Sequence, residues 1–277
     1  MLRTEAYRAA PGGVARTDDG MENWRPSRAG LPRGPVTCLD LDPASPVDAR
    51  RLLAAVFGHG VYASNDGGES WREASGGLGA NRNVWSIRRR ASTAWLLVVR
   101  RLVRGSECPG SLYRSDDGAG SWHAVALPSG VGWPNWLAVD PAAPDRLYLA
   151  CWPEDVEGRR LGGGLLVSSD AGASWQRCFD ESAYAYGVSV GPDGTVFLCT
   201  FQGRLWRSRD RGRTWAVVEG IRFTWQKAVQ TDPRDPSRIF VSTFGAGLWR
   251  GRARGLVRRD RIRFRVDALD VAPGDAP

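Results

Sequence analysis

The 277-residue sequence predicts an all-β fold, a six-bladed β-propeller made of four-stranded antiparallel blades. A short phrase ending in tryptophan recurs along the chain at intervals of about 40 to 53 residues, the length of one propeller blade. Short apolar runs separated by turn residues precede each copy, and the two ends of the chain carry complementary halves of one more copy. Each element of this prediction follows from a particular stretch of sequence.

The strands are expected to lie in the same succession in every blade. In the clearest copy an apolar run at 36–41 ends in an Asp-Pro pair, a second run covers 51–56, and a third follows a glycine turn at 60–63. Apolar and β-branched runs bounded by such turns predict short strands that follow one another as a meander. The corresponding stretches elsewhere are 136–167 and 229–250.

The recurring phrase, which we call the octapeptide, reads Ser/Thr-x-Asp-x-Gly-x-Ser/Thr-Trp, with 64–71 as its clearest copy. Hydroxyl and aspartate side chains bond to nearby backbone groups in tight turns, and glycine supplies the positive φ that such turns need. The tryptophan is expected to pack as a large apolar plug between neighbouring sheets, so the octapeptide residues are assigned a structural role. They are Asp19, Asp66, Asp117, Asp170 and Asp210, with Trp24, Trp71, Trp122, Trp175 and Trp215.

The octapeptide is the signature of the Asp-box, or BNR, repeat, and the chain resembles Asp-box β-propeller proteins over nearly its whole length. That family includes sialidases, xyloglucanases, sortilin-type receptors and a photosystem assembly factor, and the chain is most similar to stand-alone bacterial BNR-repeat proteins. The resemblance implies that the octapeptides lie on the face of the propeller away from its binding site. The repeat alone does not determine the chemistry, because one fold can carry many functions.

The two termini are expected to complete each other. The segment 266–273 matches the first-strand phrase at 36–43, and the N-terminal residues match the rest of a blade. We therefore predict a single domain over 1–277, closed by a composite blade from 1–25 and 262–277. Five octapeptides and one decayed copy at 251–255 then make six blades of about 46 residues each.

Composition and charge exclude several classes of protein. The formal charge is +8, but Lys227 is the only lysine, and such an excess of arginine reflects GC-rich coding rather than a binding surface. Because the chain also has no long block of basic residues, nucleic acid is disfavoured as a partner. The apolar run at 94–99 is too short to span a membrane, and no secretory signal opens the chain, so we expect a cytoplasmic monomer. Five cysteines without a CxxC pair, together with two histidines, predict no metal site, and no cofactor is expected.

A binding site is expected on the face opposite the octapeptides, where the loops between second and third strands surround the central channel. Two insertions, 100–110 and 152–164, are expected to form long loops there, whereas Trp85 and Trp136 are expected to pack between blades. Aromatic and arginine side chains converge on this rim, a combination that suits sugar stacking with an anionic group, or a protein hot spot. The rim candidates are Arg33, Arg82, Trp133, Trp152, Tyr184, Tyr186, Arg222, Trp225 and Arg263.

The catalytic set of a sialidase is incomplete in this sequence. The Arg-Ile-Pro phrase that the resemblance implies near the start is missing, and no tyrosine follows Tyr186, although the family's nucleophile lies late in the chain. Three rim arginines remain available to bind a carboxylate. They are Arg33, Arg222 and Arg263.

A glycosidase with a carboxylate pair is the wider enzymatic alternative. The weak catalytic candidates are Glu154 and Asp155, both in the second insertion. Because no complete catalytic set is visible, we predict a non-enzymatic binding or scaffold protein whose basic, aromatic rim binds a protein partner or an anionic glycan. The alternative is a glycoside hydrolase, sialidase-like or of another glycan-cleaving type.

Overall fold

The computed structural model describes residues 6–252, apart from 11, 20–21, 43, 91, 104–105, 109, 202–203, 220–225, 233–234, 236 and 244–247. Within these residues the chain is all-β, with one short 3-10 turn, η1 (Val47–Ala49). None of the described segments is a helix with the length and apolar character needed to cross a membrane.

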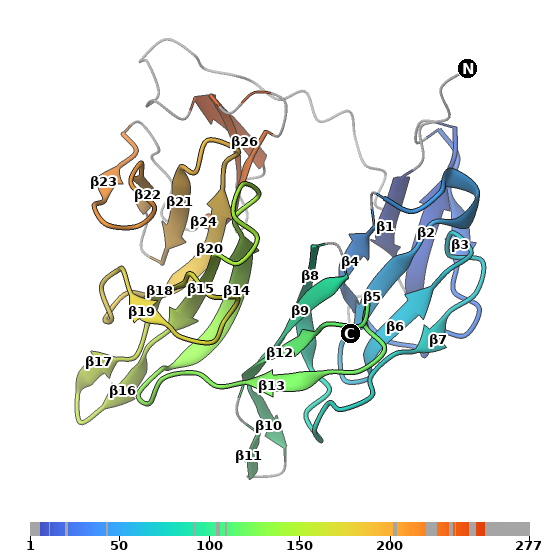
Figure 1. Ribbon diagram of the computed structural model, residues 1–277, viewed down its shortest axis with the longest axis horizontal. Coiled ribbons are helices and arrows are strands. Elements are labelled where there is room, and N and C mark those ends of the chain that lie inside the picture. Colours follow the sequence, from blue (N-terminus) through green and yellow to red (C-terminus); the bar gives the residue numbers. More distant parts are fainter. Residues whose placement is uncertain are drawn as a thin grey trace, which may run out of the picture.

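Six sheets follow one another along the chain, and each is an antiparallel meander (Figure 1). The first has three described strands, and the second and third have four each. The strands of the first sheet are β1 (Ala6–Ala10), β2 (Gly13–Thr17) and β3 (Arg25–Ser27); those of the second are β4 (Val36–Leu41), β5 (Leu52–Val56), β6 (Gly60–Ser64) and β7 (Arg72–Glu73); those of the third are β8 (Val84–Arg90), β9 (Thr93–Val98), β12 (Ser111–Ser115) and β13 (His123–Val125).

The fourth and fifth sheets again have four strands, and the sixth has three described strands. The fourth consists of β14 (Trp133–Val139), β15 (Leu147–Trp152), β18 (Gly164–Ser168) and β19 (Gln176–Arg177); the fifth of β20 (Ala185–Val190), β21 (Val196–Thr200), β22 (Arg204–Ser208) and β23 (Ala216–Val217); the sixth of β24 (Gln226–Thr231), β25 (Arg238–Thr243) and β26 (Leu248–Arg252). The prediction of an all-β fold with four-stranded antiparallel sheets is thereby confirmed.

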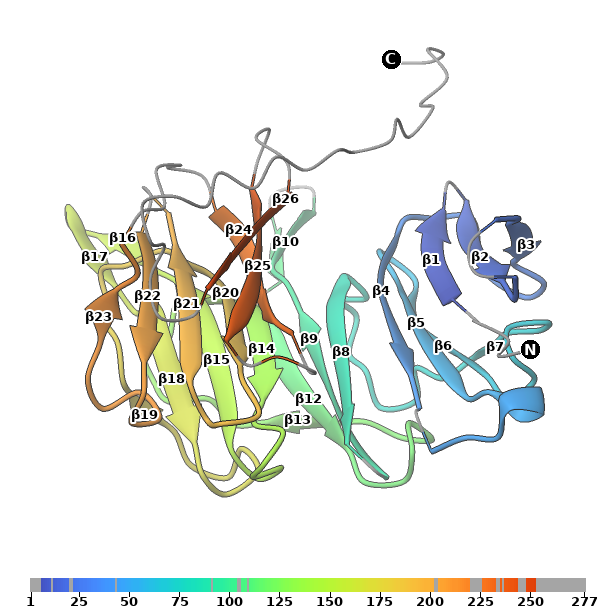
Figure 2. The same ribbon diagram turned by 90° about the horizontal axis from the view of Figure 1, so that it is seen from above.

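The first strands of consecutive sheets contact one another in chain order, β4 with β8, β8 with β14, β14 with β20, and β20 with β24. Figures 1 and 2 show the sheets side by side with these strands innermost. The buried side chains form clusters that bridge neighbouring sheets, as where Leu53 of the second sheet packs with Ile87 and Leu96 of the third. The second strands of the second to fifth sheets are buried on both faces, which explains why β5 is a continuous apolar run rather than an alternating one.

The two insertions form β-hairpins, not the long loops predicted from the sequence. They are β10 (Arg101–Val103) with β11 (Ser106–Cys108), and β16 (Glu154–Val156) with β17 (Arg159–Leu161). The turn of the second hairpin has positive φ at Glu157 and Gly158, the turn geometry that matches the twist of two paired strands. Both hairpins join second to third strands, and they project from the same side of the sheets (Figure 2).

The octapeptides form the turns between third and fourth strands, held by the same hydrogen bonds in each case. In the second sheet the Ser64 hydroxyl donates to Asp66 Oδ1 at 2.7 Å and accepts from the Gly68 amide at 2.8 Å. Asp66 Oδ1 in turn accepts from the Ser70 amide at 3.0 Å. Equivalent bonds recur in the third, fourth and fifth sheets, because the same side chains stand at the same spacing.

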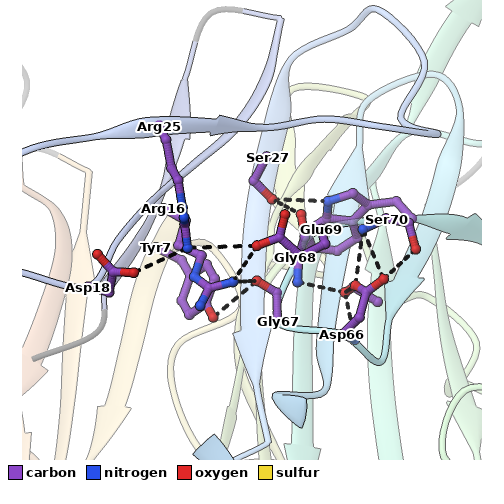
Figure 3. A network of polar contacts seen from close by, with 12 residues as sticks. Tyr7, Arg16, Asp18, Arg25, Ser27, Asp66, Gly67, Gly68, Glu69 and Ser70 are labelled. Carbon is purple, nitrogen blue, oxygen red and sulfur yellow. Dashed lines mark hydrogen bonds and ion pairs between the residues drawn. The ribbon is translucent and has the colours of Figure 1, made fainter. Parts of the chain in front are cut away.

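The octapeptide turns of the second to fifth sheets also join their sheet to the one before it. At the boundary of the first and second sheets, Arg16 Nη1 donates to the Gly67 carbonyl at 2.9 Å and lies 3.0 Å from Glu69 Oε1 (Figure 3). The indole nitrogens of Trp71 and Trp122 reach back to Ser27 Oγ at 3.2 Å and to the Ala74 carbonyl at 2.8 Å. These contacts stabilise the packing of consecutive sheets and lie away from the two hairpins.

Closure of the ring stays a prediction. The C-terminal part of the composite blade, 262–277, and the decayed octapeptide at 253–255 lie outside the described residues, as do residues 1–5 of the N-terminal part. The first sheet contacts the second through β1 and β4. The described sheets therefore follow a propeller-like arc, and the number of blades in a closed ring is not decided by them.

Candidate functional site

A β-bulge interrupts the first strand of every sheet from the second to the sixth, close to the start of the strand. The pairing with the second strand shifts by one residue there, which leaves a single residue without a partner in the ladder. A bulge bends the strand and redirects a side chain, so this position carries a side chain out of the regular alternation. The five residues are Thr37, Trp85, Asn135, Tyr186 and Lys227.

Four of these bulge residues line one cleft with a volume of about 570 Å³. The cleft runs from the third sheet to the sixth, at the end of the strands from which the hairpins project. Half of its lining residues are aromatic. The lining residues are Trp85, Val99, Arg100, Trp133, Pro134, Asn135, Trp136, Trp152, Tyr186 and Lys227, and we call this surface the aromatic cleft.

Aromatic rings from the fourth and fifth sheets pack against each other beside the cleft. The rings of Trp152 and Tyr186 lie 4.7 Å apart between centroids at an angle of 51°. Tyr184 lies 6.2 Å from Trp152 and 5.9 Å from Phe201, both edge-on. Burial raises the pKa of Tyr186, so its phenol stays neutral at physiological pH. Ring pairs of this kind contribute to the packing of the cleft wall.

Trp133 is held at the mouth of the cleft by three elements of structure. It begins β14 and pairs with Trp152, the last residue of β15. Its indole Nε1 donates to Glu154 Oε1 in hairpin β16–β17 at 2.5 Å. The guanidinium of Arg100, just after β9, lies 4.1 Å from the centroid of its ring. The ring is therefore contacted by an anion at its edge and by a cation on one face.

The polar groups of the aromatic cleft are mainly donors. Arg100 and Lys227 line it, and no carboxylate stands among its described lining residues. The indole Nε1 of Trp152 is buried there and has no acceptor among the residues described. The amide of Asn135 donates to the Tyr186 carbonyl at 2.8 Å, which ties the fourth sheet to the fifth. The arrangement suits an apolar ligand face together with acceptor oxygens.

The structure brings some of the predicted rim residues together and separates others. Trp133, Trp152 and Tyr186 line the aromatic cleft, and Tyr184 packs against Trp152. The remaining predicted residues do not meet them. Arg33 is exposed before β4, Arg82 pairs with Glu73 at 3.6 Å outside the cleft lining, and Arg222, Trp225 and Arg263 lie outside the described residues.

The expectation for Trp85 and Trp136 was incomplete. Both contact the buried clusters between sheets, as predicted, but both are half-buried and also line the aromatic cleft. Trp85 reaches the cleft because it occupies a bulge, which a strict two-residue alternation does not anticipate. Lys227 was not predicted at all. One signal was available in the sequence: the single lysine of the chain lies near the start of a first strand, at the position that corresponds to Trp85 and Tyr186 in other sheets.

The two candidate carboxylates have different surroundings and do not face each other across the cleft. Asp155 Oδ1 accepts from the Gly158 amide at 3.0 Å and so holds the turn of the hairpin. Glu154 bonds to Trp133 at the mouth. Across the described ranges, no group of three histidine, cysteine or acidic residues is placed to hold a metal ion.

Comparison with known proteins finds sequence similarity to xyloglucanases. No family model matches the chain. A xyloglucanase from Paenibacillus sp is 33% identical over 128 residues, which are 39% of this chain and 12% of that protein. The chain thus spans a small part of the length of the curated relatives it matches.

The chain shares its fold with solved structures, among them a GH74 xyloglucanase and YCF48. The GH74 xyloglucanase from Xanthomonas campestris has a TM-score of 0.66 at 21% identity, over 88% of this chain and 41% of the other. YCF48 bound to a D1 peptide has a TM-score of 0.65 at 14% identity, over 92% of this chain and 77% of the other. At these identities the likenesses establish a propeller-type fold.

Proposed function

We propose that this protein acts on glycans and that the aromatic cleft holds the sugar chain. The observation that carries the proposal is the cluster of indole and phenol rings from Trp85, Trp133, Trp136, Trp152 and Tyr186 in one cleft. A pyranose ring presents a C–H face that packs on an aromatic face and hydroxyl groups that hydrogen-bond at its rim. Indole N–H, amide and cationic groups at the same site supply donors for those hydroxyls.

The similarity to xyloglucanases supports the glycan class and favours a glycoside hydrolase over the non-enzymatic scaffold first expected. Hydrolysis of a glycosidic bond ordinarily needs two carboxyl groups that flank it. Glu154 bonds to Trp133 at the mouth of the cleft, and the described lining residues of the cleft carry no carboxyl group. Binding and cleavage are therefore separate parts of the proposal and need separate measurements.

The binding part is tested by calorimetric titration with xyloglucan, cellulose and uronate oligosaccharides. We expect Trp152→Ala to weaken the best ligand about tenfold or more, since a stacked aromatic surface is lost. Trp24→Ala is the matched control, because Trp24 is half-buried outside the cleft with Arg8 stacked on it. Failure of the whole panel to bind, or an unchanged affinity in Trp152→Ala, would overturn the proposal.

The variant Arg100→Ala tests whether the bound glycan is acidic. If the ligand carries a carboxylate, Arg100→Ala weakens the uronate oligosaccharide more than the neutral one, because an arginine fork recognises carboxylate. Arg33→Ala removes an equal charge from an exposed position outside the cleft lining and should change neither affinity. Cleavage is followed in parallel by release of reducing ends from each oligosaccharide.

A peptide is the second candidate ligand. It is favoured by the shared fold with YCF48 in its complex with a D1 peptide. An array of unrelated peptides, read with the same Trp152→Ala variant, distinguishes the two classes. Peptide binding that is lost in this variant, with no glycan bound, would favour the peptide.

A further inference from the structure

The connection between β15 and hairpin β16–β17 places Glu154 beside Trp133. Trp152 ends β15 opposite Trp133, and after Pro153 the chain enters β16 at Glu154. The hairpin therefore starts two residues beyond the cleft wall, with its first side chain at the indole edge. The 2.5 Å bond from Trp133 Nε1 to Glu154 Oε1 follows from this short connection.

The direction of the hydrogen bond between Trp133 and Glu154 follows from the chemistry of the two groups. An indole N–H is only a donor, so Glu154 Oε1 must accept and offer a lone pair. A general acid has to present a proton from its carboxyl group to the leaving oxygen, and with Oε1 bound to the indole only Oε2 of Glu154 is left for that. With the guanidinium of Arg100 at 4.1 Å on one face of the ring, the orientation of the Trp133 indole is defined both at its edge and on that face.

We propose that Glu154 is a positioning residue, which holds the Trp133 indole in the orientation that packs on a sugar ring, and that it is not the proton donor of a hydrolase. This inference rests on the proposed function. Without the carboxylate, the ligand itself must immobilise the indole on binding. An immobilised side chain of this kind changes affinity by about threefold to tenfold.

Three variants separate positioning from proton donation. Glu154→Ala removes the acceptor, Glu154→Gln keeps an acceptor oxygen but no acidic proton, and Glu157→Ala removes an equal charge from the exposed turn of the same hairpin. We expect Glu154→Ala to weaken the bound oligosaccharide about threefold to tenfold, with Glu154→Gln and Glu157→Ala close to wild type. The thermal midpoint of each variant checks that the fold is retained.

The indole N–H resonance of Trp133, assigned with Trp133→Phe, gives a readout that does not depend on any ligand. It should move upfield in Glu154→Ala and stay near its place in Glu154→Gln. An unmoved resonance, an unchanged affinity in Glu154→Ala, or loss of hydrolysis in Glu154→Gln at unchanged affinity would each overturn the positioning role. A wild-type protein that binds no glycan would overturn the proposed function and this role together.

Discussion

Replacing Arg89 by methionine tests how the second and third sheets are held together. Its guanidinium lies 3.4 Å from Asp40 Oδ1 and 3.8 Å from Asp42 Oδ2, and its side chain is 7% exposed. Asp42 has a second cation, Arg51, at 2.6 Å, whereas Asp40 pairs with Arg89 alone among the ion pairs of the described residues. The substitution therefore leaves one largely buried carboxylate, 17% exposed, without the cation it pairs with.

The expected loss is about 3 to 5 kcal/mol of unfolding free energy, the cost of removing one partner of a buried ion pair. Urea unfolding followed by tryptophan fluorescence would show it as a fall in the midpoint of about 1 to 2 M. Arg51→Met is the matched control: its side chain is 54% exposed and Asp42 keeps Arg89 as a second cation, so the expected loss is about 1 kcal/mol at most. The double variant Arg89→Met with Asp40→Asn should recover much of the loss, because the carboxylate that remains, Asp42, still has Arg51 as its cation.

The loss should also depend on pH. Burial raises the pKa of Asp40 above its ordinary value, although the charge of Arg89 opposes the rise. In the fold Asp40 then takes up its proton at a higher pH than in the unfolded chain, and this favours the fold as pH falls. Without Arg89 the pKa rises further, so the deficit of Arg89→Met should shrink toward acid pH. A deficit below about 1 kcal/mol, or one that is equal at every pH, would refute the reasoning.

Three further predictions concern the packing between two sheets, an octapeptide turn and a buried thiol. Gly77 has φ of +86°, and a Cβ there would lie 2.0 Å from the Trp122 carbonyl, so Gly77→Ala should lower the melting temperature more than Gly118→Ala, where φ is +73° and the space is open. The hydrogen bond from the Ser174 hydroxyl is the largest of the contacts that lower the pKa of Asp170 to about 2. The ionised Asp170 carboxylate therefore stabilises the fold above its ordinary pKa, and this contribution is lost as pH falls toward 2. Ser174→Ala should raise that pKa, as measured by carboxyl NMR titration, and a titration that does not move contradicts the assignment. Burial raises the pKa of the Cys151 thiol to about 12, so thiol reagents should label it only on unfolding, and rapid labelling of the native protein would contradict its burial.

The octapeptides show how much of the fold a sequence can carry. Their turns could be predicted because every group that forms them, from Ser64 to Ser70, lies within a few residues and bonds locally. The strands could be predicted because the apolar run of β5 has the length and turn boundaries of a buried strand. The hairpin β16–β17 was missed because its eight residues carry no apolar alternation, and only the turn at Glu157 and Gly158 indicates it.

The repeat, the strand order and the turns can be read from the amino-acid sequence alone, since each depends on residues close together in the chain. Which aromatic residues share a cleft depends on the fold, because a bulge moves Trp85 and Tyr186 out of the alternation and sheet packing then brings them together. The same holds for Glu154. In the sequence it is one of several acidic residues of an insertion, whereas in the fold its carboxylate accepts a hydrogen bond from the Trp133 indole. A contact between neighbouring strand ends is a consequence of register, and one residue of shift is enough to change it.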